Sequence, residues 1–293
     1  PLPGVPGRGE QDFVGGASSR RRPSTRDVVV IGASTGGPSA LRELLSELPA
    51  EFPFPIIVVQ HLPPTFTKAL AQQLDRQLEL RVKEAEHGEL LESGVVFIAP
   101  GEKHLLVNYG VSSGVGWDQQ PTDRLVGRRS PNPFDHQQDV RNRLMSAAPA
   151  HQSSVELVPP YVCLTIELSD GPKIDGNRPA IDVTLQSVTQ TCGARATGIL
   201  LTGMGEDGAE GLSLLRKKGG TTFAQSEESC VVFGMPKRAI ELDAAQHIGS
   251  PQEIGRQLAM QVDERSSFNR YVNGVRANAG ANAVVATAIT PSA

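Results

Sequence analysis

The stretch that decides the fold is Val28-Val29-Val30-Ile31-Gly32-Ala33-Ser34-Thr35-Gly36-Gly37-Pro38. The four β-branched residues before Gly32 predict a short strand that is buried on both faces, as the strands of parallel sheets are. Pro38 suits the first turn of a helix. Apolar residues then recur at helical spacing, at Leu41, Leu44, Leu45 and Leu48. The stretch therefore predicts a strand, a tight turn and an amphipathic helix in succession.

The same unit recurs along the chain. Further short apolar runs predict strands at residues 56–59, 95–99, 161–168, 199–201 and 230–233. Apolar residues at helical spacing lie between most of these runs, and a last helix carries Ile254, Leu258 and Val262. Strands that alternate with helices imply right-handed crossovers and a parallel sheet. We therefore expect an α/β protein with three α/β/α layers, a mostly parallel doubly wound sheet and one β-hairpin.

Three segments of the 293 residues have a different composition. Residues 1–26 are rich in Gly, Pro, Ser and Arg, and residues 264–293 lack helix caps, so both are expected to be disordered tails. Residues 108–160 hold few aliphatic side chains. They predict a flexible insertion that lengthens the hairpin between the two halves. The folded domain is expected over residues 27–263.

Charge and cysteine content exclude several classes of protein. The net charge of −4 gives no overall basic field that would hold nucleic acid. Cys163, Cys192 and Cys230 are widely spaced, which argues against a disulfide framework or a zinc site and fits a reducing cytoplasm. No apolar run is long enough to cross a membrane. We therefore expect a cytoplasmic protein without membrane insertion.

The turn from Gly32 to Gly36 has the pattern G-x-S-x-G between an expected strand and an expected helix. This is the context of a nucleophile elbow, in which the Ser34 hydroxyl projects and backbone N–H groups face a developing oxyanion. A glycine-rich turn that cradles phosphate is the alternative. The glycine spacing matches neither common nucleotide-binding pattern.

Two other polar segments follow expected strands and should lie at the same sheet edge. His61 comes directly after the second strand, and an imidazole there can accept the serine proton and return it to a leaving group. Glu206 and Asp207 lie in a glycine-rich loop after a later strand. Either acid could orient the histidine, and a helix cap is the simpler role for an Asp at this position.

The motifs together resemble a known family, the catalytic domain of bacterial chemotaxis protein-glutamate methylesterases of the CheB type. The likeness covers roughly residues 27–107 and 161–250. It is carried by IGASTGGP, QHLPPTFT, KEAEHGE, IAPGEKH, NRPAIDV, LTGMGEDGAEG and SCVVFGMP, which occur in this order. The resemblance implies Ser34, His61 and Asp207 as catalytic residues, with the backbone N–H groups of Thr35 and Met204 at the oxyanion.

The resemblance also implies a reaction and a partner. The substrates are glutamyl methyl esters on the helical cytoplasmic region of chemoreceptors, some relatives also deamidate receptor glutamines, and no metal or organic cofactor is needed. Relatives usually begin with a receiver domain, for which residues 1–26 are too short, so the chain is expected to be a fragment or a stand-alone esterase. A receptor-binding module without turnover and a nucleotide-binding protein are the competing hypotheses.

Overall fold

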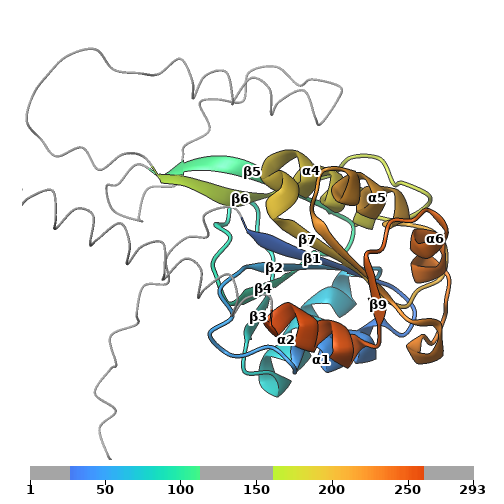
Figure 1. Ribbon diagram of the computed structural model, residues 1–293. Helices are drawn as coiled ribbons and strands as arrows, with labels where there is room; N and C mark the ends of the chain where they lie inside the picture. The colour runs from blue at the N-terminus through green and yellow to red at the C-terminus, as the bar shows by residue number, and fades with distance from the viewer. Residues whose placement is uncertain (1–26, 113–160, 261–293) are drawn as a thin grey trace, which may run out of the picture.

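The computed structural model describes residues 27–112 and 161–260. Seven parallel strands form one sheet in the order β3-β4-β2-β1-β7-β8-β9, and helices cover both faces (Figure 1). The strands of this sheet are β1 (Val28–Ala33), β2 (Ile56–Gln60), β3 (Arg81–Glu84), β4 (Val95–Ile98), β7 (Ala196–Leu200), β8 (Thr221–Gln225) and β9 (His247–Gly249). β5 (His104–Ser112) and β6 (Tyr161–Ser169) pair as an antiparallel hairpin. The expected fold class is confirmed.

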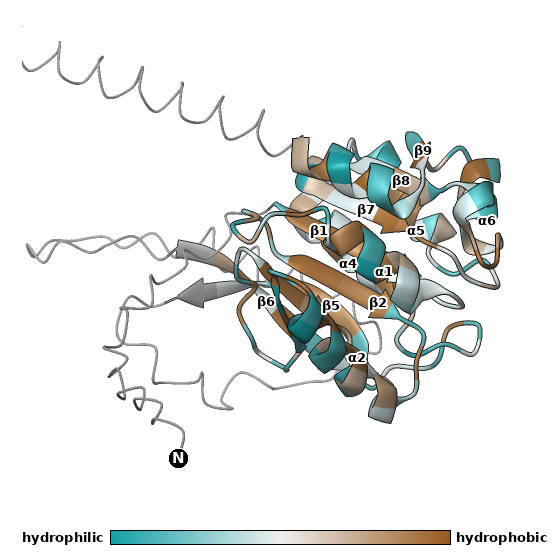
Figure 2. Ribbon diagram, turned by 90° about the horizontal axis from the view of Figure 1, so that it is seen from below, coloured by the Kyte–Doolittle hydropathy of each residue, from teal (hydrophilic) through white to brown (hydrophobic). Residues whose placement is uncertain are grey.

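Each face of the sheet has its own apolar core. Along β1 the side chains alternate, so that Val28 and Val30 join one core while Val29 and Ile31 join the other. The first core packs against α4 (Ile181–Cys192), α5 (Ala209–Lys217) and α6 (Met235–Glu241). The second packs against α1 (Gly37–Leu45), α2 (Pro64–Gln77) and the helix at 251–260. Figure 2 shows the central strands as the most hydrophobic part of the domain.

The position of β1 determines where the functional loops meet. β1 pairs with β2 on one side and with β7 on the other. The order of the strands therefore reverses at β1, and the loops that follow β2, β1 and β7 all leave from the same edge. In open α/β sheets such a switch point is where ligands bind.

The prediction of a strand at residues 230–233 is wrong. These residues form a loop in which the N–H of Val232 donates to Thr202 Oγ1 at 2.9 Å and its carbonyl accepts from Gly203 N at 3.0 Å. The backbone polar groups are thus bound to the loop after β7 instead of a neighbouring strand. Val231 is 69% exposed, so apolar character in this run does not mean burial.

The hairpin also differs from the expectation. β5 continues through Asn108 to Ser112, so the first five residues of the expected insertion belong to a strand, and Ser112 pairs with Tyr161. Residues 113–160, like the expected tails at 1–26 and 264–293, lie outside the described residues.

Candidate active site

The loop after β1 is a tight turn that presents Ser34. The Gly37 N–H donates to the Ser34 carbonyl at 2.9 Å, and the Ser34 N–H donates to the Thr202 carbonyl at 3.0 Å. Gly36 has a φ of 83°, and a Cβ on it would lie 2.7 Å from Val231 Cβ. Both the backbone conformation and the lack of space therefore require glycine at Gly36.

A buried glutamine supports this turn from the next strand. Gln60, the last residue of β2, is 1% exposed and donates from Nε2 to the Ser34 carbonyl at 2.8 Å. Gln60 is a functional residue whose role the sequence motifs do not indicate. A polar residue that ends an otherwise apolar strand is the signal that could have identified it.

His61 and Asp207 are in direct contact. His61 Nε2 and Asp207 Oδ2 lie 2.8 Å apart, and the two side chains are 13% and 5% exposed. The His61 N–H donates to the Ala33 carbonyl at 3.1 Å, which ties the histidine to the residue before Ser34. Since Asp207 occupies Nε2, Nδ1 is the ring nitrogen left for a reacting group.

Asp207 is held by the start of α4 as well as by His61. Its Oδ2 accepts from Ile181 N at 2.7 Å, and its Oδ1 accepts from Asp182 N at 3.0 Å. Backbone N–H groups at a helix N-terminus favour a negative charge. The carboxylate therefore has a fixed orientation toward the imidazole. Glu206, the other candidate, is 73% exposed and pairs with Arg238 at 3.2 Å.

The Ser34 hydroxyl makes no hydrogen bond to a residue of the described ranges, and neither does His61 Nδ1. Ser34 and the loop after β7 are nevertheless close, because a Cβ on Gly203 would lie 2.7 Å from Ser34 Cβ. The backbone N–H groups of Thr35 and Met204 likewise have no acceptor within the part of the chain that the structure describes. These groups are free to meet a substrate at the edge formed by β2, β1 and β7.

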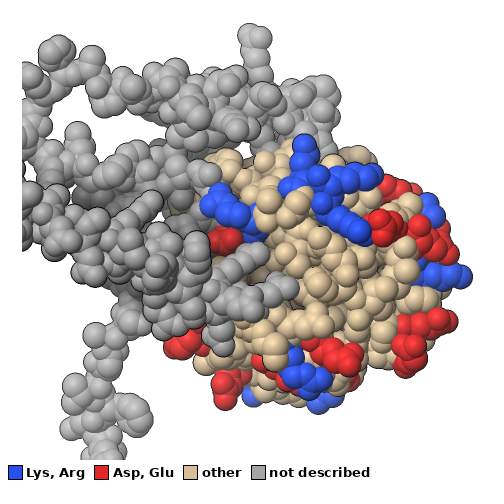
Figure 3. Space-filling view, viewed as in Figure 1, with Lys and Arg blue, Asp and Glu red and all other residues tan. Residues whose placement is uncertain are grey.

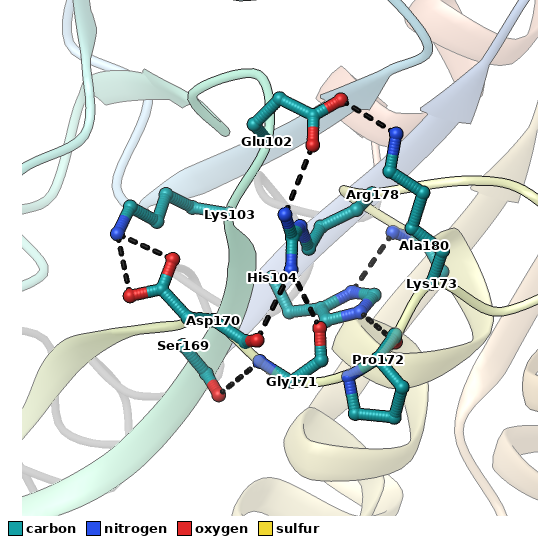
Figure 4. A network of polar contacts seen from close by, with 10 residues as sticks. All are labelled: Glu102, Lys103, His104, Ser169, Asp170, Gly171, Pro172, Lys173, Arg178 and Ala180. Carbon is teal, nitrogen blue, oxygen red and sulfur yellow. Dashed lines mark hydrogen bonds and ion pairs between the residues drawn. The ribbon is translucent and has the colours of Figure 1, made fainter.

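A polar network fixes the segment that leads into α4 (Figure 4). The buried His104 donates from Nε2 to the Pro172 carbonyl at 2.9 Å and accepts at Nδ1 from Ala180 N at 3.2 Å. Arg178 donates to the Gly171 carbonyl at 2.9 Å and pairs with Glu102 at 3.0 Å. The helix start that holds Asp207 is thus anchored on the hairpin side of the domain.

Cys230 lies close to this edge but is poorly suited to act as a nucleophile. Burial raises the pKa of the thiol to about 11, so the reactive thiolate is scarce at neutral pH.

Two other features, a metal-binding cluster and a membrane span, are not found among the described residues. No three His, Cys, Asp or Glu side chains at residues 27–112 and 161–260 are grouped so that they could hold a metal ion. None of the described helices has the length and apolar character needed to span a membrane. The face drawn in Figure 3 carries acidic and basic side chains around a broad uncharged area, and basic side chains gather along its upper edge.

Comparison with known proteins gives a match to the CheB methylesterase family over residues 29–258. The chain belongs to this family. A protein-glutamate methylesterase/protein-glutamine glutaminase of Archaeoglobus fulgidus is 39% identical over 246 residues, which are 82% of this chain and 56% of the relative. One from Paraburkholderia xenovorans is 38% identical over 235 residues, 80% of this chain and 51% of the relative. The chain therefore spans about half the length of these curated relatives.

A solved CheB structure has the same fold. The crystal structure of the Thermotoga maritima CheB methylesterase catalytic domain aligns with a TM-score of 0.61 at 34% identity, covering 81% of this chain and 100% of that one. The sequence resemblance to CheB-type methylesterases is confirmed by these matches.

Proposed function

We propose that this domain hydrolyses glutamyl methyl esters with Ser34 as the nucleophile. One observation carries the proposal: the His61–Asp207 pair, largely shielded from solvent and 2.8 Å apart, lies at the sheet edge where the Ser34 turn also lies. A histidine oriented by a carboxylate next to a projecting serine is the arrangement of a serine hydrolase. The family match supports the choice of a methyl ester as the scissile group.

The first step is acylation of the serine. The Ser34 hydroxyl reaches His61 Nδ1 when the ester is bound, its oxygen attacks the ester carbonyl carbon, and its proton passes to Nδ1. The Nε2–H remains hydrogen-bonded to the Asp207 carboxylate, whose negative charge stabilises the imidazolium. Collapse of the tetrahedral intermediate breaks the bond to the methoxy group, which leaves as methanol with the proton from Nδ1.

The second step releases the product. Water gives a proton to His61 Nδ1 and attacks the acyl carbon, and Ser34 leaves with that proton. The glutamic acid that is formed releases its remaining proton to solvent, so that a glutamate carboxylate remains. In both steps the free N–H groups of Thr35 and Met204 stabilise the oxyanion. Each well-aimed donor of this kind typically contributes about 10²- to 10³-fold in rate.

The substrate follows from the family rather than from the geometry alone. The relatives named above are methylesterases and glutaminases. We therefore assign this chain the methylated cytoplasmic helical region of chemoreceptors as its partner, deamidation of receptor glutamines with release of ammonia as a second activity, and the cytoplasm as its location. The catalytic domain corresponds to residues 27–263.

The test is methanol release from a methylated receptor fragment. Ser34→Ala should lower the rate by at least about 10³-fold, because both the attack and the covalent intermediate are lost. Ser39→Ala is the matched control, since Ser39 lies in α1 and its hydroxyl donates to Glu43 at 3.1 Å. A Ser34→Ala enzyme that keeps its turnover would refute the mechanism, and receptor binding without turnover by the wild type would favour a non-catalytic module.

A further inference from the structure

Two carboxylates, those of Asp207 and Asp182, connect the starts of α4 and α5. Asp207, in the loop before α5, accepts the first N–H groups of α4 at 2.7 and 3.0 Å. Asp182, in the first turn of α4, accepts the Gly211 N–H of α5 at 2.6 Å. The start of α4 is therefore held by an acid from the loop before α5, and the start of α5 by an acid from α4; the two helices lie side by side in Figure 1.

The Asp182 carboxylate lies near the residue that follows Asp207. The backbone of Gly208, which has a φ of 94°, is close enough to lower the pKa of Asp182. A Cβ on Gly211 would lie 2.7 Å from Leu185 Cβ, so the two helices pack here without room for a larger residue. Through the Gly211 N–H, Asp182 restrains the start of α5, which follows Asp207, while the start of α4 restrains the Asp207 side chain.

Holding two carboxylates so close together is less favourable in free energy than capping a helix with one polar side chain. Burial, and then the neighbouring charge of Asp207, raise the pKa of Asp182 to about 6, although the Gly211 N–H donates to it. A neutral asparagine at this position would also accept the Gly211 N–H, without a second negative charge close to Asp207. An unfavourable feature that the surrounding structure enforces suggests a functional role.

We propose that Asp182 is a positioning residue for the reaction, which holds Asp207 at the distance and angle that keep His61 oriented toward Ser34. This proposal rests on the proposed function. Asp182 acts on the histidine only through Asp207, and no contact with the substrate is involved. Its loss should therefore lower kcat and leave KM nearly unchanged.

The experiment compares Asp182→Ala and Asp182→Asn with the wild type at neutral pH. Asp182→Ala should lower kcat by about 10- to 100-fold, because displacements of about 1 Å behind a catalytic group have effects of that size. Asp182→Asn keeps an oxygen that accepts the Gly211 N–H and should restore kcat to within about threefold. KM should stay within about twofold in both variants.

A readout independent of turnover is the NMR signal of the His61 Nε2 proton shared with Asp207. It should broaden or shift in Asp182→Ala and remain in place in Asp182→Asn. Glu253→Ala is the matched control, because Glu253 accepts the Ser250 N–H at 2.8 Å at the start of the helix at 251–260. This control should lose stability without changing kcat or the His61 signal.

Wild-type kcat and an unshifted His61 signal in folded Asp182→Ala would overturn the proposal. If that variant does not fold, Asp182→Glu replaces it, because it keeps the charge but moves the carboxylate by one methylene group. Wild-type kcat in Asp182→Glu would overturn the proposal equally. A wild-type protein that releases no methanol would instead refute the proposed function, while the His61 signal would still report whether Asp182 holds the pair.

Discussion

Replacement of Asp207 by asparagine separates its two roles, helix cap and partner of His61. The carboxylate accepts three hydrogen bonds: from His61 Nε2 and Ile181 N on one oxygen, and from Asp182 N on the other. An amide has only one acceptor oxygen. Whichever way it turns, its NH₂ group faces at least one N–H donor.

The less costly orientation keeps the oxygen toward His61 and Ile181 and leaves the Asp182 N–H without its acceptor. An unsatisfied group of this kind costs about 1–3 kcal/mol. For a domain of about 150–250 residues each kcal/mol shifts Tm by about 2–4 °C, so Tm should fall by roughly 2–12 °C. The imidazolium formed in the reaction also loses its anionic partner, and kcat should fall by about 10²- to 10⁴-fold.

The assay measures methanol release and thermal unfolding on the same preparations of wild type and Asp207→Asn. The expected result is a large loss of kcat at a temperature at which the variant is fully folded. A lowered Tm with kcat within about threefold of wild type would mean that Asp207 is only a helix cap. That result would refute the role assigned to the His61–Asp207 pair.

Three other predictions address the surroundings of the site. Burial raises the pKa of Asp182 from 3.8 to about 6, so between these pH values the folded protein holds a proton that the unfolded chain releases. The free energy of unfolding should therefore fall by at most about 3 kcal/mol as pH rises from about 4 to 6. Denaturant titrations should show that Asp182→Asn lacks this loss, and parallel curves for the two proteins would contradict the prediction. Gly36→Ala should lower both Tm and methanol release, because the new Cβ would meet Val231 at 2.7 Å with φ at 83°; an unchanged enzyme would show that the turn is not constrained. Joining Ser112 to Tyr161 through an Asn-Gly turn should change Tm by only a few degrees, since these residues already pair in register; a collapse of stability would show that residues 113–160 contribute to the core.

The fold could be predicted where apolar runs coincide with buried strands. β1 and β2 are such runs, and every residue of both is buried. β8 was missed because its sequence, Thr-Thr-Phe-Ala-Gln, has little aliphatic character, although Thr222 and Gln225 are buried. Residues 230–233 show the reverse case, in which an apolar run is taken up by a loop whose backbone hydrogen bonds go to the turn after β7.

From the sequence, only those site residues could be predicted that lie in loops directly after expected strands. Ser34 and His61 directly follow strands, and Asp207 follows β7 within a glycine-rich loop, so their common edge could be inferred from the sequence. Gln60 and Asp182 were missed because their roles depend on hydrogen bonds to residues 26 and 29 positions away in the chain. No local pattern predicts such contacts.

Labelling with a fluorophosphonate, which reacts covalently with serine hydroxyls that a neighbouring base activates, tests directly whether Ser34 is the nucleophile. The wild-type protein should take up one label, and peptide mass spectrometry should place it on Ser34. Labelling should be lost in Ser34→Ala and strongly slowed in His61→Gln. A wild-type protein that stays unlabelled, or one labelled at another residue, would contradict the claim that Ser34 is the activated nucleophile.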